Sequence, residues 1–424
     1  MKRKLIALGL VLVMAVSLLA GCSNKEPAST NDASEVTLAI VGPQTGDNAE
    51  YGKSMKTAAQ IAVDEWNEKG GVIGKQIKLV DYDDANSSEQ AASVAEKIVG
   101  DPSICAVMGH FSSGVAMTAA EVYQEAGIAL VNGSAAHMDY AKIGDCIFRN
   151  NAIYTTDANT MLQIMEWLGV KKFGILNPNT DAGVSVTSAV EDMMERYGDK
   201  YTLELVEPQL YEDGTVDFTA TVAWFQEQGV EAVYSSGAYS ATAPFIQQYR
   251  AKDPNVKFVM SAACFSKEFL ELAGDDAEGV VLGTSFFYGS DNEAVKSFTE
   301  KYTEAYGSEP STFAAQIYDA TYAILYAIEK GNSADRADIV KNLADTDFQG
   351  VTGKIVFDAE GNCPKEQVLL EIKDGEYHEV PGVPVARPGG DATRDMNKYQ
   401  LSALPLSKQW AAGGGSPPAA DGLR

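Results

Sequence analysis

The chain has 424 residues, of which 45% are hydrophobic and 22% are charged, and its formal net charge is -26. Such an acidic chain has no basic surface to displace counterions from phosphates, which argues against nucleic acid and anionic lipid headgroups as partners. The length and the hydrophobic content are sufficient for the cores of about two globular lobes.

The N-terminus has the pattern of a secretory signal peptide over residues 1–21. Three basic residues precede a largely apolar run over 5–20, which is shorter than the roughly 20 residues of a membrane span. The run ends in Leu-Ala-Gly-Cys, which resembles a bacterial lipoprotein signal and implies lipidation of Cys22. Residues 22–35 are polar and without periodicity, typical of a flexible tether. We therefore expect a bacterial protein that is extracytoplasmic and lipid-anchored to the cell membrane.

After the tether, short apolar runs alternate with segments in which apolar residues recur every three or four positions. The runs predict strands over 36–41, 77–82, 104–108, 128–131, 173–176, 202–206, 232–234 and 257–260. The periodic segments predict helices over 54–67, 89–99, 113–125, 157–168, 183–197, 218–228 and 241–250. This alternation predicts an α/β fold with two doubly wound parallel-sheet lobes. Binding loops are expected at the carboxyl ends of the strands, over 42–52, 109–114 and 132–137.

Several segments carry a resemblance to one family. They are residues 67–74 (NEKGGVIG), 79–84 (LVDYDD), 91–99, 313–320 (FAAQIYDA) and 350–362 (GVTGKIVFDAEGN). In this order, they resemble the leucine/isoleucine/valine-binding protein family, the type I periplasmic binding proteins of ABC importers. The resemblance implies a monomer that binds a small-molecule ligand and delivers it to an ABC permease in the cytoplasmic membrane.

The family topology implies two lobes joined by a three-strand hinge. Lobe 1 would comprise 36–154 and 286–362, and lobe 2 would comprise 155–285 and 363–382. A hinge of this kind allows the lobes to close as rigid bodies around a ligand. A ligand that touches both lobes then interacts differently with the open and closed states.

The family's ligand loop matches His110-Phe111-Ser112-Ser113-Gly114, where a serine and backbone N–H groups receive the ligand carboxylate. The physics agrees, because a helix N-terminus at Ser113 favours an anion; the alternative role for Ser113 is a helix N-cap. The resemblance also places Tyr51 as an aromatic wall, with an exposed turn tyrosine as the alternative. The full set of predicted ligand-binding residues is Ser113, Ser112, Phe111, Tyr51, Ser134, Ala135, Asp181 and Tyr239.

The sequence departs from the amino-acid-binding pattern at four aligned positions. These positions, where the family commonly has a threonine, two aromatic residues and an acid, hold Ala136, Ala182, Ala238 and Ala263. Each alanine removes bulk or a polar partner, so the pocket is expected to be roomier and to lack the usual acid for an α-ammonium. The predicted ligand is larger than a branched-chain amino acid or lacks a free α-amino group. Asp181 and Tyr239 are candidates to substitute from neighbouring positions, with a helix N-cap and a packed surface aromatic as their alternative roles.

Two other function classes remain open at this point. An extracellular hydrolase of amides or esters would use Ser112 or Ser113 with His110, although no G-x-S-x-G elbow is present. A sensory receptor would use the same fold and closure to signal to a membrane protein. We expect no enzyme.

No metal site and no cofactor are expected, because no Cys-x-x-Cys pair occurs and the Gly-Lys-Ser at 52–54 lacks the spacing of a phosphate loop. The disulfide state of Cys105, Cys146, Cys264 and Cys363 stays open. Residues 387–424 are expected to be a low-complexity tail.

Overall fold

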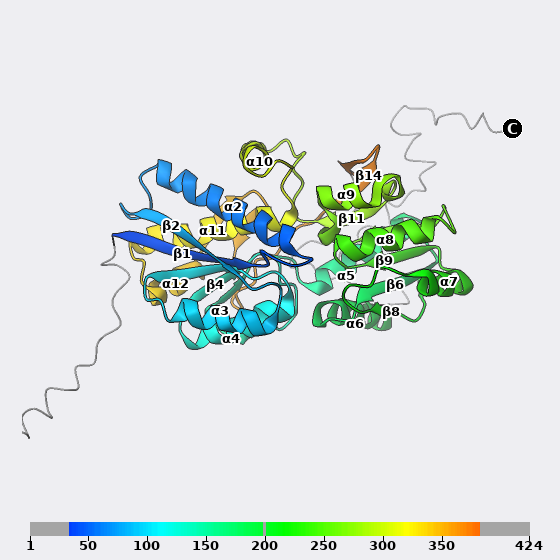
Figure 1. The fold of residues 1–424 in the computed structure, drawn as a ribbon, viewed down its shortest axis with the longest axis horizontal. Coiled ribbons are helices and arrows are strands. Elements are labelled where there is room, and N and C mark those ends of the chain that lie inside the picture. The colour runs from blue at the N-terminus through cyan, green and yellow to red at the C-terminus, as the bar shows by residue number, and fades with distance from the viewer. Residues whose placement is uncertain (1–33, 198–200, 382–424) are drawn as a thin grey trace, which may run out of the picture.

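The computed structural model of the protein describes residues 34–197 and 201–381. The predicted signal peptide, Cys22, nearly all of the tether and the tail over 387–424 lie outside the described residues. The described part forms two lobes side by side, each built around one sheet (Figure 1). Within these ranges no helix is long and apolar enough to cross a membrane, and no cluster of metal-ligating side chains occurs.

The first sheet has five parallel strands in the order β2-β1-β3-β4-β5. The strands are β1 (Glu35–Gly42), β2 (Gln76–Asp83), β3 (Ile104–Gly109), β4 (Ala129–Asn132) and β5 (Ile147–Arg149). Alternate side chains of β1 point to opposite faces, so Leu38 and Ile40 enter one apolar core while Ala39 and Val41 enter the other. Both faces are therefore buried, as the continuous apolar run predicts.

Helices cover both faces of the first sheet. They are α2 (Ala49–Glu68), α3 (Ser88–Val99), α4 (Ser113–Glu125), α11 (Thr312–Gly331) and α12 (Arg336–Leu343). Helix α10 (Glu293–Tyr306) packs on α2 instead. The core on one face holds α2, α11 and α12, and the core on the other face holds α3 and α4. The hairpin of β12 (Asp347–Gly350) and β13 (Gly353–Val356) adds Ile355 to the α2 side.

The second sheet has eight strands in the order β15-β14-β11-β10-β9-β6-β7, with β8 also paired to β6. Its strands are β6 (Lys172–Pro178), β7 (Glu204–Leu205), β8 (Gln209–Tyr211), β9 (Ala232–Ser235), β10 (Lys257–Met260), β11 (Val281–Thr284), β14 (Val368–Lys373) and β15 (Glu376–Glu379). Pairing is parallel from β6 to β11, whereas β14 and β15 join antiparallel. The helices of this lobe are α5 (Tyr154–Trp167), α6 (Asp181–Tyr197), α7 (Thr219–Gln228), α8 (Tyr239–Arg250) and α9 (Lys267–Ala273).

The chain passes between the lobes after β5, after β11 and after β13. The buried Gln316 of α11 holds the first two of these crossings together. Its Nε2 donates to Asn151 Oδ1 at 2.7 Å and to Ser285 Oγ at 2.9 Å. This buried amide therefore ties the first two crossings to each other and to α11.

The α/β class with two parallel-sheet lobes is confirmed, and most predicted elements agree with the structure to within a few residues. Among the helices predicted from periodicity, the largest error in a bound is at α2, which begins at Ala49 and not at residue 54. Helices α9, α10 and α12 were not predicted. Tyr51 is therefore a helix residue with 4% exposure, and its alternative role as an exposed turn tyrosine is wrong. The four described cysteines are all buried free thiols, which answers the question of their pairing.

Candidate functional site

A cavity of about 760 Å³ lies between the two lobes. In the first lobe its walls come from the loops after β3 and β4, and in the second lobe from the starts of α6 and α8. The cavity therefore lies at the carboxyl ends of parallel strands, where doubly wound sheets bind ligands. Each of the three crossings adds one polar residue to its lining: Asn151, Ser285 and Gln367.

The N-terminus of α4 opens into this cavity. Ser112 takes the N-cap position without a side-chain capping bond, and no acid lies in the first turn. The first N–H groups of the helix therefore face the cavity without an intrahelical partner, which makes this end attractive to an anion. Ser113 is 3% exposed, and its Oγ lies 3.0 Å from Tyr154 Oη and accepts from Ala136 N at 3.2 Å. The Ser113 hydroxyl thus joins the start of α4 to the loop after β4 and to the first residue of α5.

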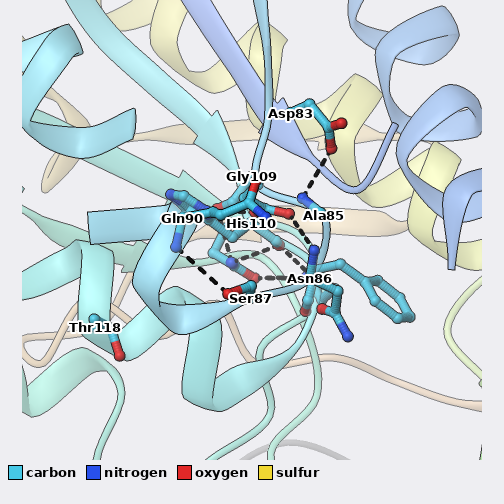
Figure 2. Close-up of polar contacts among 12 residues, drawn as sticks. Asp83, Ala85, Asn86, Ser87, Gln90, Gly109, His110 and Thr118 are labelled. Atoms are coloured by element: carbon cyan, nitrogen blue, oxygen red, sulfur yellow. Dashed lines mark hydrogen bonds and ion pairs between the residues drawn. The ribbon is translucent and has the colours of Figure 1, made fainter. Parts of the chain in front are cut away.

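The loop before α4 is supported by buried polar groups. Ser134 Oγ donates to the His110 and Phe111 carbonyls at 2.8 and 2.7 Å, and Asn132 Nδ2 donates to the Gly109 carbonyl at 2.7 Å. His110 belongs to the same loop, and its side chain, labelled in Figure 2, is fully buried. The predicted residue Ser134 lines the cavity, and in this structure its hydroxyl holds the backbone of His110 and Phe111 in place.

The ring of His110 points away from the serines of the loop. Its Nδ1 lies 2.7 Å from Asp84 Oδ2, and its Nε2 lies 3.4 Å from Tyr123 Oη. Both ring nitrogens are thereby engaged inside the first lobe. A hydrolase would need an imidazole nitrogen within hydrogen-bond reach of Ser112 or Ser113, and this geometry does not provide one.

An aromatic contact closes one side of the cleft. Tyr51 of α2 stacks on Phe111 with ring centroids 4.2 Å apart, and lies 5.5 Å from the ring of Tyr239 in the second lobe. Its hydroxyl donates to the Ala263 carbonyl of the second lobe at 2.9 Å. Burial raises the pKa of Tyr51 well above its ordinary value, so the hydroxyl remains a proton donor in this contact.

The predicted site residues divide into two groups. Those that line the cavity are Phe111, Ser112, Ser113, Ser134 and Asp181. The other three do not line it: Tyr51 lies against Phe111, Ala135 is buried in the core of the first lobe, and Tyr239 packs on Tyr51. The four alanines at positions where the sequence departs from the amino-acid-binding pattern all line the cavity: Ala136, Ala182, Ala238 and Ala263.

Asp157 is a lining residue that the sequence reasoning did not select. It lies in the first turn of α5, and its Oδ1 accepts from Gln367 Nε2 at 2.7 Å. Burial raises the pKa of Asp157 to about 6, against lowering contributions from the Gln367 hydrogen bond and the Arg149 charge. Although the position of Ala263 lacks an acid, the cavity does contain carboxylates. The only sequence signal for this residue was its place at the start of the predicted helix 157–168.

Two doubly wound lobes, joined by three crossings around a cavity at the carboxyl ends of their strands, define the architecture of a type I periplasmic binding protein. A sequence profile described as "Periplasmic binding protein" matches residues 35–375. The chain therefore belongs to this family, in its leucine/isoleucine/valine-binding branch.

Individual relatives agree with this assignment. An amino acid binding protein of Pseudomonas aeruginosa is 28% identical over 396 residues, which cover 90% of this chain and 100% of the relative. The Leu/Ile/Val-binding protein of Citrobacter freundii is 27% identical over 353 residues, which cover 82% of this chain and 93% of the relative. The branched-chain amino acid transporter substrate-binding protein LivJ of Streptococcus pneumoniae, solved in complex with isoleucine, has a TM-score of 0.76 at 27% identity. Its similarity covers 84% of this chain and 100% of that chain.

Proposed function

We propose that this protein is the extracytoplasmic substrate-binding subunit of an ABC importer. It takes a small amino-acid-like or other polar organic solute between its lobes and presents the closed form to a membrane permease. The observation that carries this proposal is the cavity of about 760 Å³ whose walls come from both lobes. Family membership supports it, because the relatives named above are binding proteins for amino acids.

The lobes 36–154 with 286–362, and 155–285 with 363–382, act as the two rigid bodies of this proposal. Closure is driven by contacts that exist only when the lobes meet. One such contact is the Tyr51–Ala263 hydrogen bond at 2.9 Å. A solute that adds further contacts to both lobes shifts the population toward the closed form.

The ligand's anionic end is received at the N-terminus of α4, by the backbone N–H groups of the first turn with Ser112 and Ser113. The remaining volume beside Ala136, Ala182, Ala238 and Ala263 accommodates a solute larger than a branched-chain amino acid. Anchoring through lipid on Cys22 keeps the protein next to its permease, since two acyl chains hold a protein on a membrane where one does not.

The engaged nitrogens of His110 favour binding without turnover over the hydrolase alternative. A sensory receptor would have the same fold and the same closure. Transport and sensing therefore differ in the membrane protein that is bound, and not in the cavity. Co-purification with a permease, compared with a membrane kinase or chemoreceptor, decides between the two.

The test combines ligand screening with a measure of shape. Thermal unfolding against a panel of amino acids and aromatic carboxylates should identify a solute, and small-angle scattering should then show a more compact particle with it. Ser113→Ala should weaken binding by about tenfold, because it removes a hydroxyl from the α4 N-terminus and leaves the Ala136 N–H without its acceptor. Ser266→Ala, which removes an N-cap serine outside the cavity, serves as the control.

An identical scattering profile with every solute would contradict the proposal. Tight binding of leucine that is abolished by Ser113→Ala would contradict only the larger ligand. Metabolic labelling with a fatty acid, lost in Cys22→Ser, tests the anchor.

A further inference from the structure

The charged residues that line the cavity are all acidic. They are Asp47, Asp157, Asp181 and Asp213, and no lysine, arginine or histidine of the described chain lines it with them. A purely anionic solute would therefore meet four carboxylates and no basic side chain. Its favourable electrostatic partners would be helix N-termini such as those of α4 and α8, each of whose macrodipoles supplies only about half a charge. This balance favours a solute that carries a positive group.

Asp157 differs from the other three acids in its surroundings. Asp47, Asp181 and Asp213 are exposed, whereas Asp157 is partly buried and is hydrogen-bonded to Gln367 of the third crossing. Charges that are exposed to water interact weakly with a ligand because the solvent screens them. The partly desolvated carboxylate of Asp157 therefore dominates the attraction for a cation.

The carboxylate of Asp157 is held in position but not neutralised. Gln367, which is 6% exposed, holds Oδ1 through a neutral amide at 2.7 Å. The nearest arginine, Arg149, donates instead to the His137 carbonyl and to Asn362 Oδ1. No ion pair of Asp157 occurs within residues 34–197 and 201–381. A half-buried carboxylate without a cationic partner is costly unless a ligand supplies the cation.

We propose that Asp157 binds a cationic amino group of the ligand, so that the cavity selects zwitterionic or cationic solutes over simple carboxylates. This assignment rests on the proposed function and adds its chemical selectivity. The carboxylate of a zwitterion lies at the α4 N-terminus, and its ammonium lies against Asp157 Oδ2. The acid that position 263 lacks is thus supplied from α5, on a wall that belongs to the second lobe. Because Gln367 comes from the third crossing, the ammonium is held directly beside the hinge.

Asp157 has one alternative role, which is purely structural. An acid in the first turn of a helix also stabilises that helix through the macrodipole, without any ligand. In that case replacement of Asp157 would lower the stability of the protein and leave ligand selectivity unchanged. The experiment must therefore measure selectivity and stability separately.

The test uses matched triplets of a zwitterion, its deaminated acid and its decarboxylated amine. One triplet is leucine, 4-methylpentanoate and 3-methylbutylamine; another is phenylalanine, 3-phenylpropanoate and 2-phenylethylamine; 5-aminopentanoate, pentanoate and pentylamine extend the series. Binding is measured by calorimetry and by thermal shift for the wild type, Asp157→Asn and Asp213→Asn. The asparagine at 157 keeps an acceptor for Gln367 and is nearly isosteric. Asp213→Asn removes one exposed lining charge and is the matched control.

We expect the wild type to bind a zwitterion or amine more tightly than the deaminated acid. Asp157→Asn should weaken that binding by about 10- to 100-fold, as the loss of a charge-assisted contact does. Asp213→Asn should change it by no more than about fivefold. Equal binding of a zwitterion and its deaminated acid, or unchanged binding in Asp157→Asn, overturns the role of Asp157 while leaving the proposed function intact. If the wild type binds no member of the panel and carries no solute by native mass spectrometry, the proposed function fails, and the role of Asp157 fails with it.

Discussion

Replacing Asp157 with asparagine should stabilise the ligand-free protein at neutral pH. The neighbours of this carboxylate are the Gln367 amide, the hydroxyls of Tyr154 and Tyr234, and the more distant charge of Arg149. Burial raises the pKa of both tyrosines, so neither becomes a charged partner near neutral pH. The dominant effect on Asp157 is therefore its own desolvation, which disfavours the ionised form.

The magnitude follows from the difference between the folded and unfolded states. The pKa of Asp157 is about 6 in the folded protein, against an ordinary value of 3.8. Each pH unit of that difference corresponds to about 1.4 kcal/mol, which gives an upper limit of about 3 kcal/mol. The folded pKa is the higher one. The contribution of Asp157 to the free energy of unfolding is therefore fully present below pH 3.8 and is lost as the pH rises through 6. Asparagine carries no charge and avoids this loss.

The assay is chemical unfolding of wild type and Asp157→Asn between pH 4 and pH 8, without ligand. The variant should be more stable by about 1 to 3 kcal/mol at pH 7.5, and the difference should shrink as the pH falls toward 4. Asp213→Asn, with an exposed side chain, should change the stability by less than about 0.5 kcal/mol at either pH. Equal or lower stability of Asp157→Asn at pH 7.5, or a difference that does not depend on pH, would refute the desolvation argument.

Three further predictions concern closure, the hinge and ligand titration. Tyr51→Phe removes the hydrogen bond to the Ala263 carbonyl and should weaken ligand binding by about two- to tenfold, with a less compact scattering profile; an unchanged profile argues against this contact in closure. Gln316→Leu removes the hydrogen bonds that join Asn151 and Ser285 and should lower the free energy of unfolding by about 1 to 3 kcal/mol in denaturant titrations; an unchanged free energy of unfolding would contradict this. Calorimetry should show that an amine binds more tightly as the pH rises through about 6, because Asp157 must lose its proton to receive a cation; flat binding over this range would exclude that role.

Apolar periodicity and helix-start residues predicted most of the helices and strands, because these signals lie within each element. The bounds of α4 agree with the predicted 113–125. Its apolar positions indicate the buried face of the helix, and its N-terminal serines indicate where the helix begins. The first turn of α2 was not predicted, since Glu50 and Lys53 interrupt the apolar periodicity there. Strand β5 has three residues, which is too short for a pattern of alternation to register.

The site was only partly predictable for a related reason. Ser113 and its loop follow from a helix start after a strand, which is a local signal. The role of Asp157 depends on Gln367, which lies 210 positions away in the chain and reaches it only through the third crossing. Sequence periodicity shows that Asp157 begins a helix, but it does not show which wall of which cavity that helix start will line. The position of the acid is a tertiary property.

Strand β1 begins at Glu35, at the pole of the first lobe that is remote from the second lobe (Figure 1). This follows from the sheet, because the opposite ends of its parallel strands meet the cavity. An attachment upstream of Glu35 would therefore hold the molecule at the end that is remote from the cavity, and the cavity would stay open to solutes.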